Sequence, residues 1–194
     1  MQVSCRIVLQ FLTLVAAASL WAGSVSAQTL VIVRHAEKSE PWLAEDRLQP
    51  LSRDGLERAE RLRTLVRDLD VKAVFTSNTT RTISTAMPAA VEKGLRPFPH
   101  PACEKTDSLD AFMTMVRSTF QTSDFIVVVS HSNIIPEWLT RFRIDAGTLT
   151  EMGISFNARY NGYLVDGYDG VWIVSLPIDA DGAPHVRYAT MNVD

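Results

Sequence analysis

The chain of 194 residues carries 19 basic and 22 acidic side chains, which gives a formal net charge of −3. A mildly acidic protein has no general attraction for nucleic acid or for an anionic membrane surface, so we expect neither as a partner. Any anion that the protein binds must therefore be held by a local cluster of positive groups. The length suits one domain with a sizeable hydrophobic core.

Residues 1–27 have the features of a removable signal peptide. Arg6 provides a short basic start, an apolar run continues to Ala22, and small residues lead up to Ala27. We expect cleavage after Ala27, a periplasmic or secreted protein with no stable membrane association, and a mature domain of residues 28–194. An uncleaved anchor is the alternative, because the apolar run is near the lower limit of length for spanning a bilayer.

The mature domain would contain a single cysteine, because Cys5 lies in the leader and Cys103 is the other one. An internal disulfide is thereby excluded. Cys103 could pair with another molecule, but a buried or idle thiol is the expected state. The sequence leaves the oligomeric state open.

Apolar, β-branched segments alternate with amphipathic segments along the mature chain. This alternation predicts a three-layer α/β/α sandwich, in which a mostly parallel central sheet is covered by helices on both faces. The expected strands are residues 29–33, 71–75, 95–98 and 125–129, and the expected helices are residues 54–68, 79–93, 108–120 and 136–142. Pro88 is expected to kink or interrupt the second helix.

The first helix has a predicted start and a predicted buried face. Ser52 stands where an N-cap residue is expected. The apolar residues that follow recur at intervals of three and four, as one face of a helix requires. They are Leu56, Ala59, Leu62, Leu65, Val66 and Leu69.

The C-terminal third has a different pattern. Residues 161–165 and 171–176 are expected to be strands joined by a turn that contains Asp166 and Gly167, in the arrangement of a hairpin. We expect these strands to finish the sheet rather than to add chemistry. The sequence assigns no other role to residues 143–194.

Four side chains suited to an anion stand at the ends of predicted strands. Arg34 and His35 follow the first strand directly, Arg81 lies at the start of the helix after the second strand, and His131 follows the strand at residues 125–129. Ligands of open α/β sheets bind beyond the carboxyl ends of the strands. A parallel sheet would bring these ends to one edge, so we expect the four side chains to lie close together.

Each of these residues alone is most often structural or solvated, but together they suit phosphoryl transfer. The guanidiniums of Arg34 and Arg81 can hold phosphate oxygens through paired hydrogen bonds. A neutral His35 between them is a competent nucleophile, because adjacent cations disfavour its protonation. His131 can donate to a third oxygen, and the backbone N–H groups at the helix start can add to the anion site.

Four segments resemble, in the expected order, the motifs of the histidine phosphatase superfamily, branch 1, also called phosphoglycerate-mutase-like. They are residues 33–38 (Val-Arg-His-Ala-Glu-Lys, as in small exported bacterial members), 51–59, 75–86 and 128–133. The resemblance implies the phosphoglycerate-mutase-like fold, a phosphohistidine intermediate on His35, and a phosphate pocket of Arg34, Arg81 and His131. It implies no metal and no cofactor. The histidines also lack the local spacing of zinc ligands.

The general acid of the family has no clear counterpart. Members that act on alcohol phosphates commonly place a Glu after the third strand, to protonate the leaving oxygen. The matching stretch offers Glu104 and Asp107, neither in a recognisable copy of the acidic motif. Glu104 has the better offset from the strand. In the alternative interpretation both are solvated loop residues, or Asp107 caps the next helix.

Residues near the nucleophile have two interpretations each. Glu37 and Lys38 line the mouth of the pocket, or they form a mutual salt bridge or are simply exposed. Trp42 and Trp138 form a wall of the site, or they pack in the core.

The pattern favours a metal-independent phosphatase that acts on a phosphomonoester of a small molecule or an envelope sugar, with a small phosphorylated substrate as its partner. A phosphohistidine phosphatase acting on protein is the second hypothesis, against which the leader argues. A catalytically weak phosphate-binding module is the third, favoured by the unclear acid.

Overall fold

The computed structural model describes residues 28–177 and 182–191. The expected signal peptide at residues 1–27 lies outside this part of the chain, so its presence and its cleavage remain predictions. Among the described residues, no helix is both long and apolar enough to cross a membrane.

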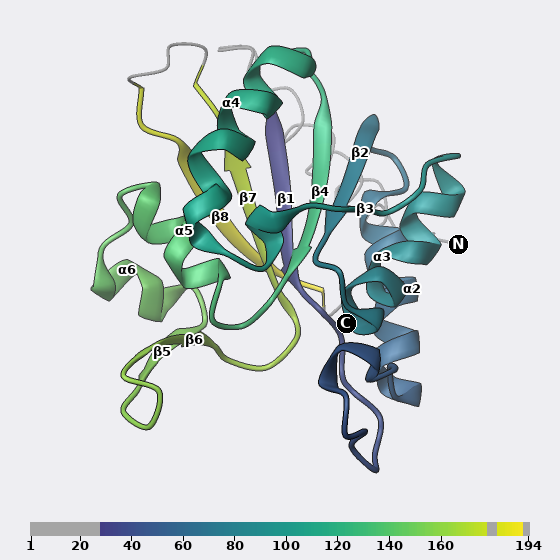
Figure 1. Cartoon of the computed structure of the whole chain (residues 1–194). Helices are drawn as coiled ribbons and strands as arrows, with labels where there is room; N and C mark the ends of the chain where they lie inside the picture. The colour runs from purple at the N-terminus through teal and green to yellow at the C-terminus, as the bar shows by residue number, and fades with distance from the viewer. Residues whose placement is uncertain (1–27, 178–181, 192–194) are drawn as a thin grey trace, which may run out of the picture.

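The centre of the molecule is a mixed sheet (Figure 1). Its strands are β1 (Thr29–Arg34), β2 (Val71–Thr76), β3 (Phe98–Pro99), β4 (Phe125–Ser130), β7 (Gly170–Ser175) and β8 (His185–Thr190). They lie in the order β3-β2-β4-β1-β7-β8. The first four strands of this order are parallel, whereas β7 and β8 are antiparallel to their neighbours. The sheet is therefore mostly parallel, as predicted.

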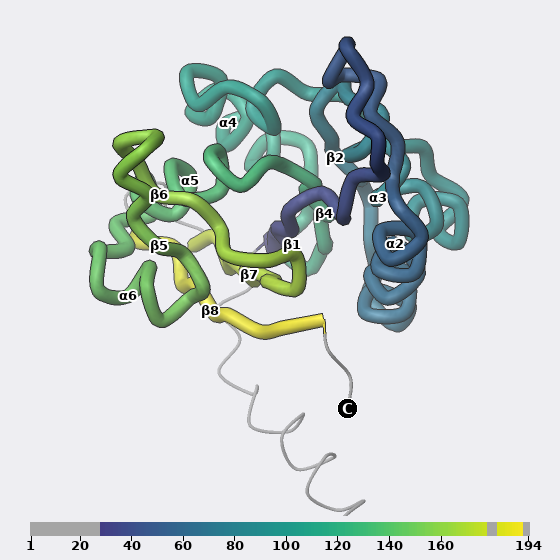
Figure 2. The backbone as a smooth tube through the Cα atoms, turned by 90° about the horizontal axis from the view of Figure 1, so that it is seen from below, coloured from purple at the N-terminus to yellow at the C-terminus, as the bar shows by residue number. Residues whose placement is uncertain are grey.

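Helices cover both faces of the sheet (Figure 2). The helices are α2 (Arg53–Val66), α3 (Thr80–Glu92), α4 (Leu109–Thr119), α5 (Ile135–Arg141) and α6 (Ala146–Glu151), with 3-10 turns η1 (Asp46–Leu48), η2 (Pro101–Cys103) and η3 (Thr106–Ser108). Figure 2 shows α2 and α3 on one side and α4, α5 and α6 on the other. This arrangement confirms the three-layer α/β/α sandwich.

Alternate residues of β1 enter two different cores. Leu30 and Ile32 belong to the core beneath α4 and α5, whereas Val31 and Val33 belong to the core beneath α2 and α3. All four are buried. A strand buried on both faces needs no polar alternation, which explains why an almost wholly apolar run forms the middle of this sheet.

The four predicted helices are confirmed with ends that move by at most two residues. The predicted interruption of α3 is wrong, because the helix continues through Pro88. Ala86, Ala89 and Ala90 are buried around this proline. Their small side chains pack against the sheet, and this packing stabilises a helix that proline by itself disfavours.

The predicted hairpin of the C-terminal third is wrong. β6 (Gly162–Val165) pairs with β5 (Ile154–Asn157) in a separate ribbon, and β7 pairs with β1 and β8. The Asp-Gly signal lies in the connection between the two sheets. The N–H of Val165 donates to the carbonyl of Ser132 (2.9 Å), which holds the end of β6 against the loop after β4.

The third strand of the sheet is shorter and later than expected. β3 covers two residues, Phe98–Pro99, instead of residues 95–98. The N–H of Leu95 donates to the carbonyl of Ala90 (2.8 Å), so this residue still belongs to the end of α3.

The buried face of α2 is narrower than the predicted stripe. Ala59, Leu62 and Val66 are buried, but Leu56 is 57% exposed and Leu65 is 41% exposed. Because Leu62 and Val66 pack in the core between the helices and the sheet, Leu56 and Leu65 lie on the solvent side of α2.

The start of α2 lies directly on that loop. Ser52 caps the helix by accepting from the N–H of Gly55 (3.1 Å), as predicted, and its own N–H donates to the carbonyl of Glu37 (2.9 Å). A Cβ atom on Gly55 would lie 2.3 Å from the Glu37 oxygen. Only glycine permits this approach, so Gly55 fixes the distance between α2 and the Arg-His-Ala-Glu-Lys segment.

We predict that Gly55→Ala lowers the free energy of unfolding by about 1–3 kcal/mol, because the new methyl group forces the helix away from Glu37. Urea denaturation measures the change. Gly162→Ala is the matched control, since its Cβ would meet its nearest neighbour at an ordinary 3.8 Å. Equal losses in the two variants would contradict the close approach at Gly55.

Candidate active site

The parallel pairing of β1 with β4 brings two histidines together. Arg34 is in register with Ser130, and His35 and His131 each follow their strand by one residue. The N–H of His35 donates to the carbonyl of Ser130 (2.9 Å). The two imidazole rings lie 5.4 Å apart between centroids, and they are only 5% and 8% exposed. The structure thus places both predicted histidines at one edge of the sheet.

The hydrogen bonds of His35 assign its tautomer. Nδ1 lies 2.8 Å from the carbonyl oxygen of Ala36. A carbonyl oxygen can only accept, so we assign the proton of the neutral ring to Nδ1. The lone pair is then on Nε2, where it can attack phosphorus. The N–H of Ala36 donates to Thr85 Oγ1 (2.9 Å), which links this segment to α3.

Both imidazoles are neutral at neutral pH. Burial, with a smaller contribution from neighbouring positive groups including Arg34 and Arg81, lowers the pKa of His35 to about 3. Burial and the nearby Arg81 lower the pKa of His131 to about 4. A neutral His35 keeps its lone pair, as a nucleophile requires.

Oxygen acceptors hold Arg34 and Arg81, in each case through Nη1 of the guanidinium. Arg81 Nη1 donates to the Asp46 carbonyl (2.8 Å) and pairs with Asp46 Oδ2 (2.9 Å). Arg34 Nη1 donates to the carbonyls of Gly167 (2.7 Å) and Val165 (3.3 Å). Within the described part of the chain, the buried Nε of each arginine has no partner. A bound anion would satisfy both donors.

A cluster of hydroxyl groups fixes the ring of His131 at the start of α3. His131 Nε2 lies 2.8 Å from Ser77 Oγ, which contacts the hydroxyls of Thr79 (3.1 Å) and Thr82 (2.9 Å). Thr79 is the N-cap of α3, but its side chain does not cap the helix. The first N–H groups of α3 therefore face the site without a side-chain acceptor, as an anion site requires.

The two candidate acids lie in different places. Glu104 is half-buried and, together with Asn78, lines a hollow of about 270 Å³. Asn78 follows Ser77, the residue that contacts His131, so the hollow borders the site. Asp107 is exposed and is not among the residues that line the hollow. Within the described residues, neither carboxylate forms a hydrogen bond or ion pair with His131.

Sequence reasoning missed an aromatic residue at the site. The Arg34 guanidinium carbon lies 4.0 Å from the centroid of the Tyr168 ring, and this ring lies 6.0 Å from that of His35. Tyr168 belongs to the connection between β6 and β7, which also supplies the carbonyls that hold Arg34. Of the two strands expected to finish the sheet, β7 joins it and β6 does not, and the connection between them adds Tyr168 to the site. A loop tyrosine without a motif gives no sequence signal for this position.

Glu37 does not pair with Lys38. Its carboxylate accepts two hydrogen bonds from Arg58 of α2, the shorter 2.6 Å from Nη2. Arg58 Nη1 also pairs with Asp169. Arg58 thus ties the segment after β1 to the loop that carries Tyr168, a link that no sequence pattern predicts.

The remaining candidates have separate roles. Lys38 pairs with Asp46 Oδ1 (3.0 Å) and lies 4.4 Å above the ring of Trp42, which is 67% exposed. Trp138 packs in the core and donates to the carbonyl of Ala102 (3.0 Å). Cys103 is buried as expected, and burial raises the pKa of its thiol.

The histidine pair makes the folded state sensitive to acid. In an unfolded chain a histidine titrates near pH 6.5, whereas the pKa is about 3 for His35 and about 4 for His131 in the fold. Between these limits the unfolded chain binds more protons. We therefore predict that the free energy of unfolding falls as the pH falls below about 6.5, by up to about 1.4 kcal/mol per pH unit for each histidine.

Urea denaturation at pH values from about 7 to about 5 measures this decline. In His131→Gln the decline should be shallower, because one of the two suppressed titrations is gone. An equal decline in both proteins would show that His131 does not resist protonation in the fold.

The sequence model of the histidine phosphatase superfamily (branch 1) matches residues 30–107, a range that includes Arg34, His35 and Arg81. The matched range ends before His131, which the pairing of β4 with β1 places beside His35. No curated protein sequence matches the chain.

Several solved phosphatase structures share the fold. The protein histidine phosphatase SixA, complexed with tungstate, has 13% identity and a TM-score of 0.59, over 84% of this chain and 97% of SixA. An Escherichia coli protein described as an alpha-ribazole-5′-P phosphatase has 17% identity and a TM-score of 0.60, over 84% and 96% of the two chains. A mycobacterial glucosyl-3-phosphoglycerate phosphatase has 12% identity and a TM-score of 0.63, over 84% and 98%.

At these identities the solved structures establish the fold, and the family sequence pattern adds the motif around the first histidine. The mostly parallel sheet and the helices on its two faces are the architecture that these solved structures share with this chain. Residues 30–107 thus match the sequence model of the histidine phosphatase superfamily, branch 1, and the described chain has the fold of solved phosphatases.

Proposed function

We propose that the protein hydrolyses a phosphomonoester of a small molecule or of an envelope sugar through a phosphohistidine on His35. The observation that supports this most directly is the state of the site. His35 is neutral with its proton held on Nδ1, and it lies beside two arginines whose buried Nε–H groups are unused. An electron-rich nucleophile next to unsatisfied cationic donors suits a phosphate ester better than a neutral ligand.

In the first step, Arg34, Arg81 and His131 hold the non-bridging oxygens of the phosphoryl group. Nε2 of His35 forms a bond to phosphorus while the bond from phosphorus to the leaving oxygen breaks. The positive donors stabilise the charge that gathers on the phosphoryl oxygens. The leaving oxygen takes a proton from Glu104, which this proposal assigns as the general acid.

In the second step, water attacks phosphorus and the bond to Nε2 breaks. The electron pair returns to His35, and the proton of the water passes to the carboxylate of Glu104. Inorganic phosphate leaves, and the site is restored.

The proposal requires no metal and no cofactor. Among the residues that the structure describes, no three His, Cys, Asp or Glu side chains are grouped as metal ligands. The charge that a metal would supply is present in the two guanidiniums.

We place the reaction outside the cytoplasm, in the periplasm or in the secreted fraction, because residues 1–27 have the sequence of a signal peptide. The mild acidity of the chain agrees with a small phosphorylated substrate rather than nucleic acid.

A phosphohistidine phosphatase is the second candidate. The fold is similar to that of the protein histidine phosphatase SixA. An imidazole is a better leaving group than an alcohol, so such a substrate depends less on a strong general acid. The absence of contact between Glu104 and His131 in the described residues favours this candidate, and the leader sequence argues against it.

We predict that His35→Ala abolishes release of phosphate from p-nitrophenyl phosphate, because the substitution removes the proposed nucleophile. Brief reaction of the wild type with labelled substrate should leave an acid-labile, base-stable phosphoenzyme, absent from His35→Ala. Equal activity in the two proteins would disprove the mechanism. Binding of phosphate without any labelled protein would instead identify a binding module.

We predict that Glu104→Gln slows hydrolysis of alkyl phosphates by about 10²- to 10⁴-fold and leaves p-nitrophenyl phosphate nearly unaffected, since nitrophenolate departs without a proton. Asp107→Asn is the matched control and should change neither rate. Equal effects of Glu104→Gln on both substrates would exclude an acid role. Faster cleavage of a phosphohistidine peptide than of any sugar phosphate would favour the second candidate.

A further inference from the structure

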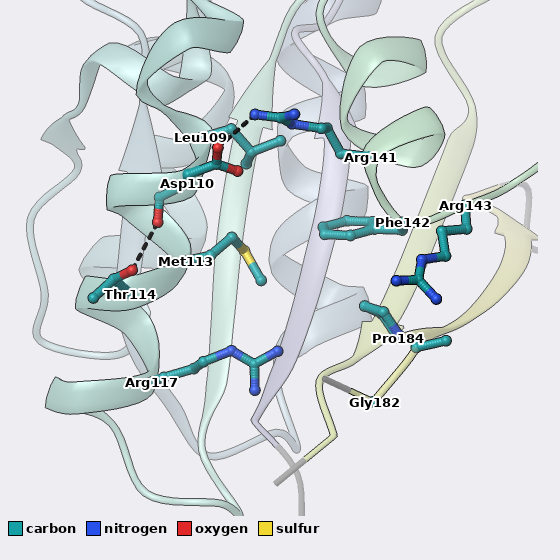
Figure 3. Close-up of a pocket in the computed structure, with 11 residues that line it drawn as sticks. Leu109, Asp110, Met113, Thr114, Arg117, Arg141, Phe142, Arg143, Gly182 and Pro184 are labelled. Carbon is teal, nitrogen blue, oxygen red and sulfur yellow. Dashed lines mark hydrogen bonds and ion pairs between the residues drawn. The ribbon is translucent and has the colours of Figure 1, made fainter. Parts of the chain in front are cut away.

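A groove of about 460 Å³ lies between α4, the end of α5 and the chain that leads into β8 (Figure 3). Its volume is within the range of small-molecule sites, about 300–1,000 Å³. Ala183 and Pro184 line it on one side, and the next residue, His185, begins β8.

The groove lies at the opposite edge of the sheet from the histidines. His185 pairs with Ser175, and Ser175 pairs with Thr29, the first residue of β1. His35 follows the other end of β1. A six-residue strand separates these edges by roughly 20 Å, so the groove is no part of the phosphate pocket.

Three guanidiniums surround the groove in an otherwise acidic protein. Among the described residues that line it, Arg117, Arg141 and Arg143 face one carboxylate, that of Asp110. Arg141 Nη2 pairs with Asp110 Oδ2 (2.5 Å), and Arg117 Nη1 donates to the carbonyl of Pro177 (2.5 Å). These contacts hold two of the guanidiniums in place while leaving further N–H groups on each. The local charge attracts anions although the whole chain would repel them.

The third guanidinium is carried by a residue in an unfavourable backbone conformation. Arg143 has a φ of 66° at the end of α5, a position at which glycine is preferred. Its N–H donates to the carbonyl of Thr140 (2.9 Å), and that of Ile144 donates to Leu139 (3.1 Å), as such a helix end requires. The side chain of Arg143 has no hydrogen bond or ion pair among the described residues. Its conformation therefore costs energy that no hydrogen bond or ion pair of the side chain offsets within the described part of the chain.

The centre of the groove is apolar. Figure 3 shows Met113 and Phe142 between the three arginines. A small inorganic anion would meet the guanidiniums but not this surface. A ligand that uses both carries an anionic group on an apolar or aromatic body.

We propose that this groove is a second, non-catalytic site that binds an organic phosphate with an aromatic or apolar body. The phosphate group lies against Arg143 and the unused N–H groups of Arg117 and Arg141, and the body covers Met113 and Phe142. The unfavourable backbone conformation of Arg143 is thereby explained, because its guanidinium completes the anion site.

Calorimetric titration of the full-length His35→Ala protein with naphthyl phosphate tests the proposal. The substitution prevents hydrolysis, so binding is observed alone. We expect two sites per chain, one in the catalytic pocket and one in the groove. Arg143→Gly should weaken only the second, by about tenfold to hundredfold, and should raise the melting temperature by about 2–4 °C because glycine relieves the backbone.

The matched control is Asn161→Gly, since Asn161 also has a positive φ, 48°, but does not line the groove. It should leave both sites unchanged. A single site in His35→Ala, or two sites that Arg143→Gly leaves intact, would overturn the proposal. Equal occupation of the groove by inorganic phosphate would overturn the requirement for an apolar body. Because the catalytic pocket is measured in the same titration, failure of the groove is distinguishable from failure of the proposed reaction.

Discussion

The parallel hydrogen bonding of β1 to β4 is the interaction on which the catalytic edge depends. It holds Arg34 beside Ser130 and so sets His35 next to His131, with the His35 N–H closing the ladder on the Ser130 carbonyl. β2 pairs with the other side of β4 and delivers the start of α3, with Arg81, to the same edge. A slip of one residue between β1 and β4 would turn every side chain of the strand to the other face. Burial of both faces makes such a slip costly, so the core itself fixes the geometry of the site.

This geometry brings together two positive guanidiniums and two imidazoles, so protonation of either imidazole is unfavourable. The four side chains lie at the same edge of the sheet, and burial keeps the imidazoles neutral by lowering their pKa. The arginines have no such response, because a guanidinium keeps its proton. The fold compensates with the carboxylate of Asp46 at Arg81 and with carbonyls and an aromatic ring at Arg34. These contacts satisfy only part of each guanidinium. The N–H groups that remain without a partner among the described residues are positive donors, and they complement the negative phosphoryl group that we propose the site binds.

The compensating residues come from parts of the chain that carry no motif. Asp46 belongs to the turn η1, and Tyr168 to the connection between β6 and β7. Arg58 pairs with both Glu37 and Asp169. It therefore ties the connection between β6 and β7 to the segment that contains His35. Residues in loops are specified by their three-dimensional neighbours rather than by periodicity. For this reason the sequence pattern pointed to the candidate reacting groups but not to the residues that hold them.

The buried strands and amphipathic helices were predictable because burial imposes a local pattern on the chain. The run at residues 29–33 had to be a strand covered on both faces, and Arg34 and His35 had to follow its end. The strands that pair with β6 and β7 depended instead on contacts between segments that are distant in the sequence. The short strand at Ile154–Asn157, which pairs with β6, had no sequence pattern that predicted it. The acid stays a proposal for a similar reason, since the place of Glu104 depends on how η2 packs beside the site. The sequence by itself determined the fold class and the side chains that we propose to react. Only the tertiary structure decided their protonation, their supports and the groove at the far edge, because burial and distance between remote segments exist only after folding.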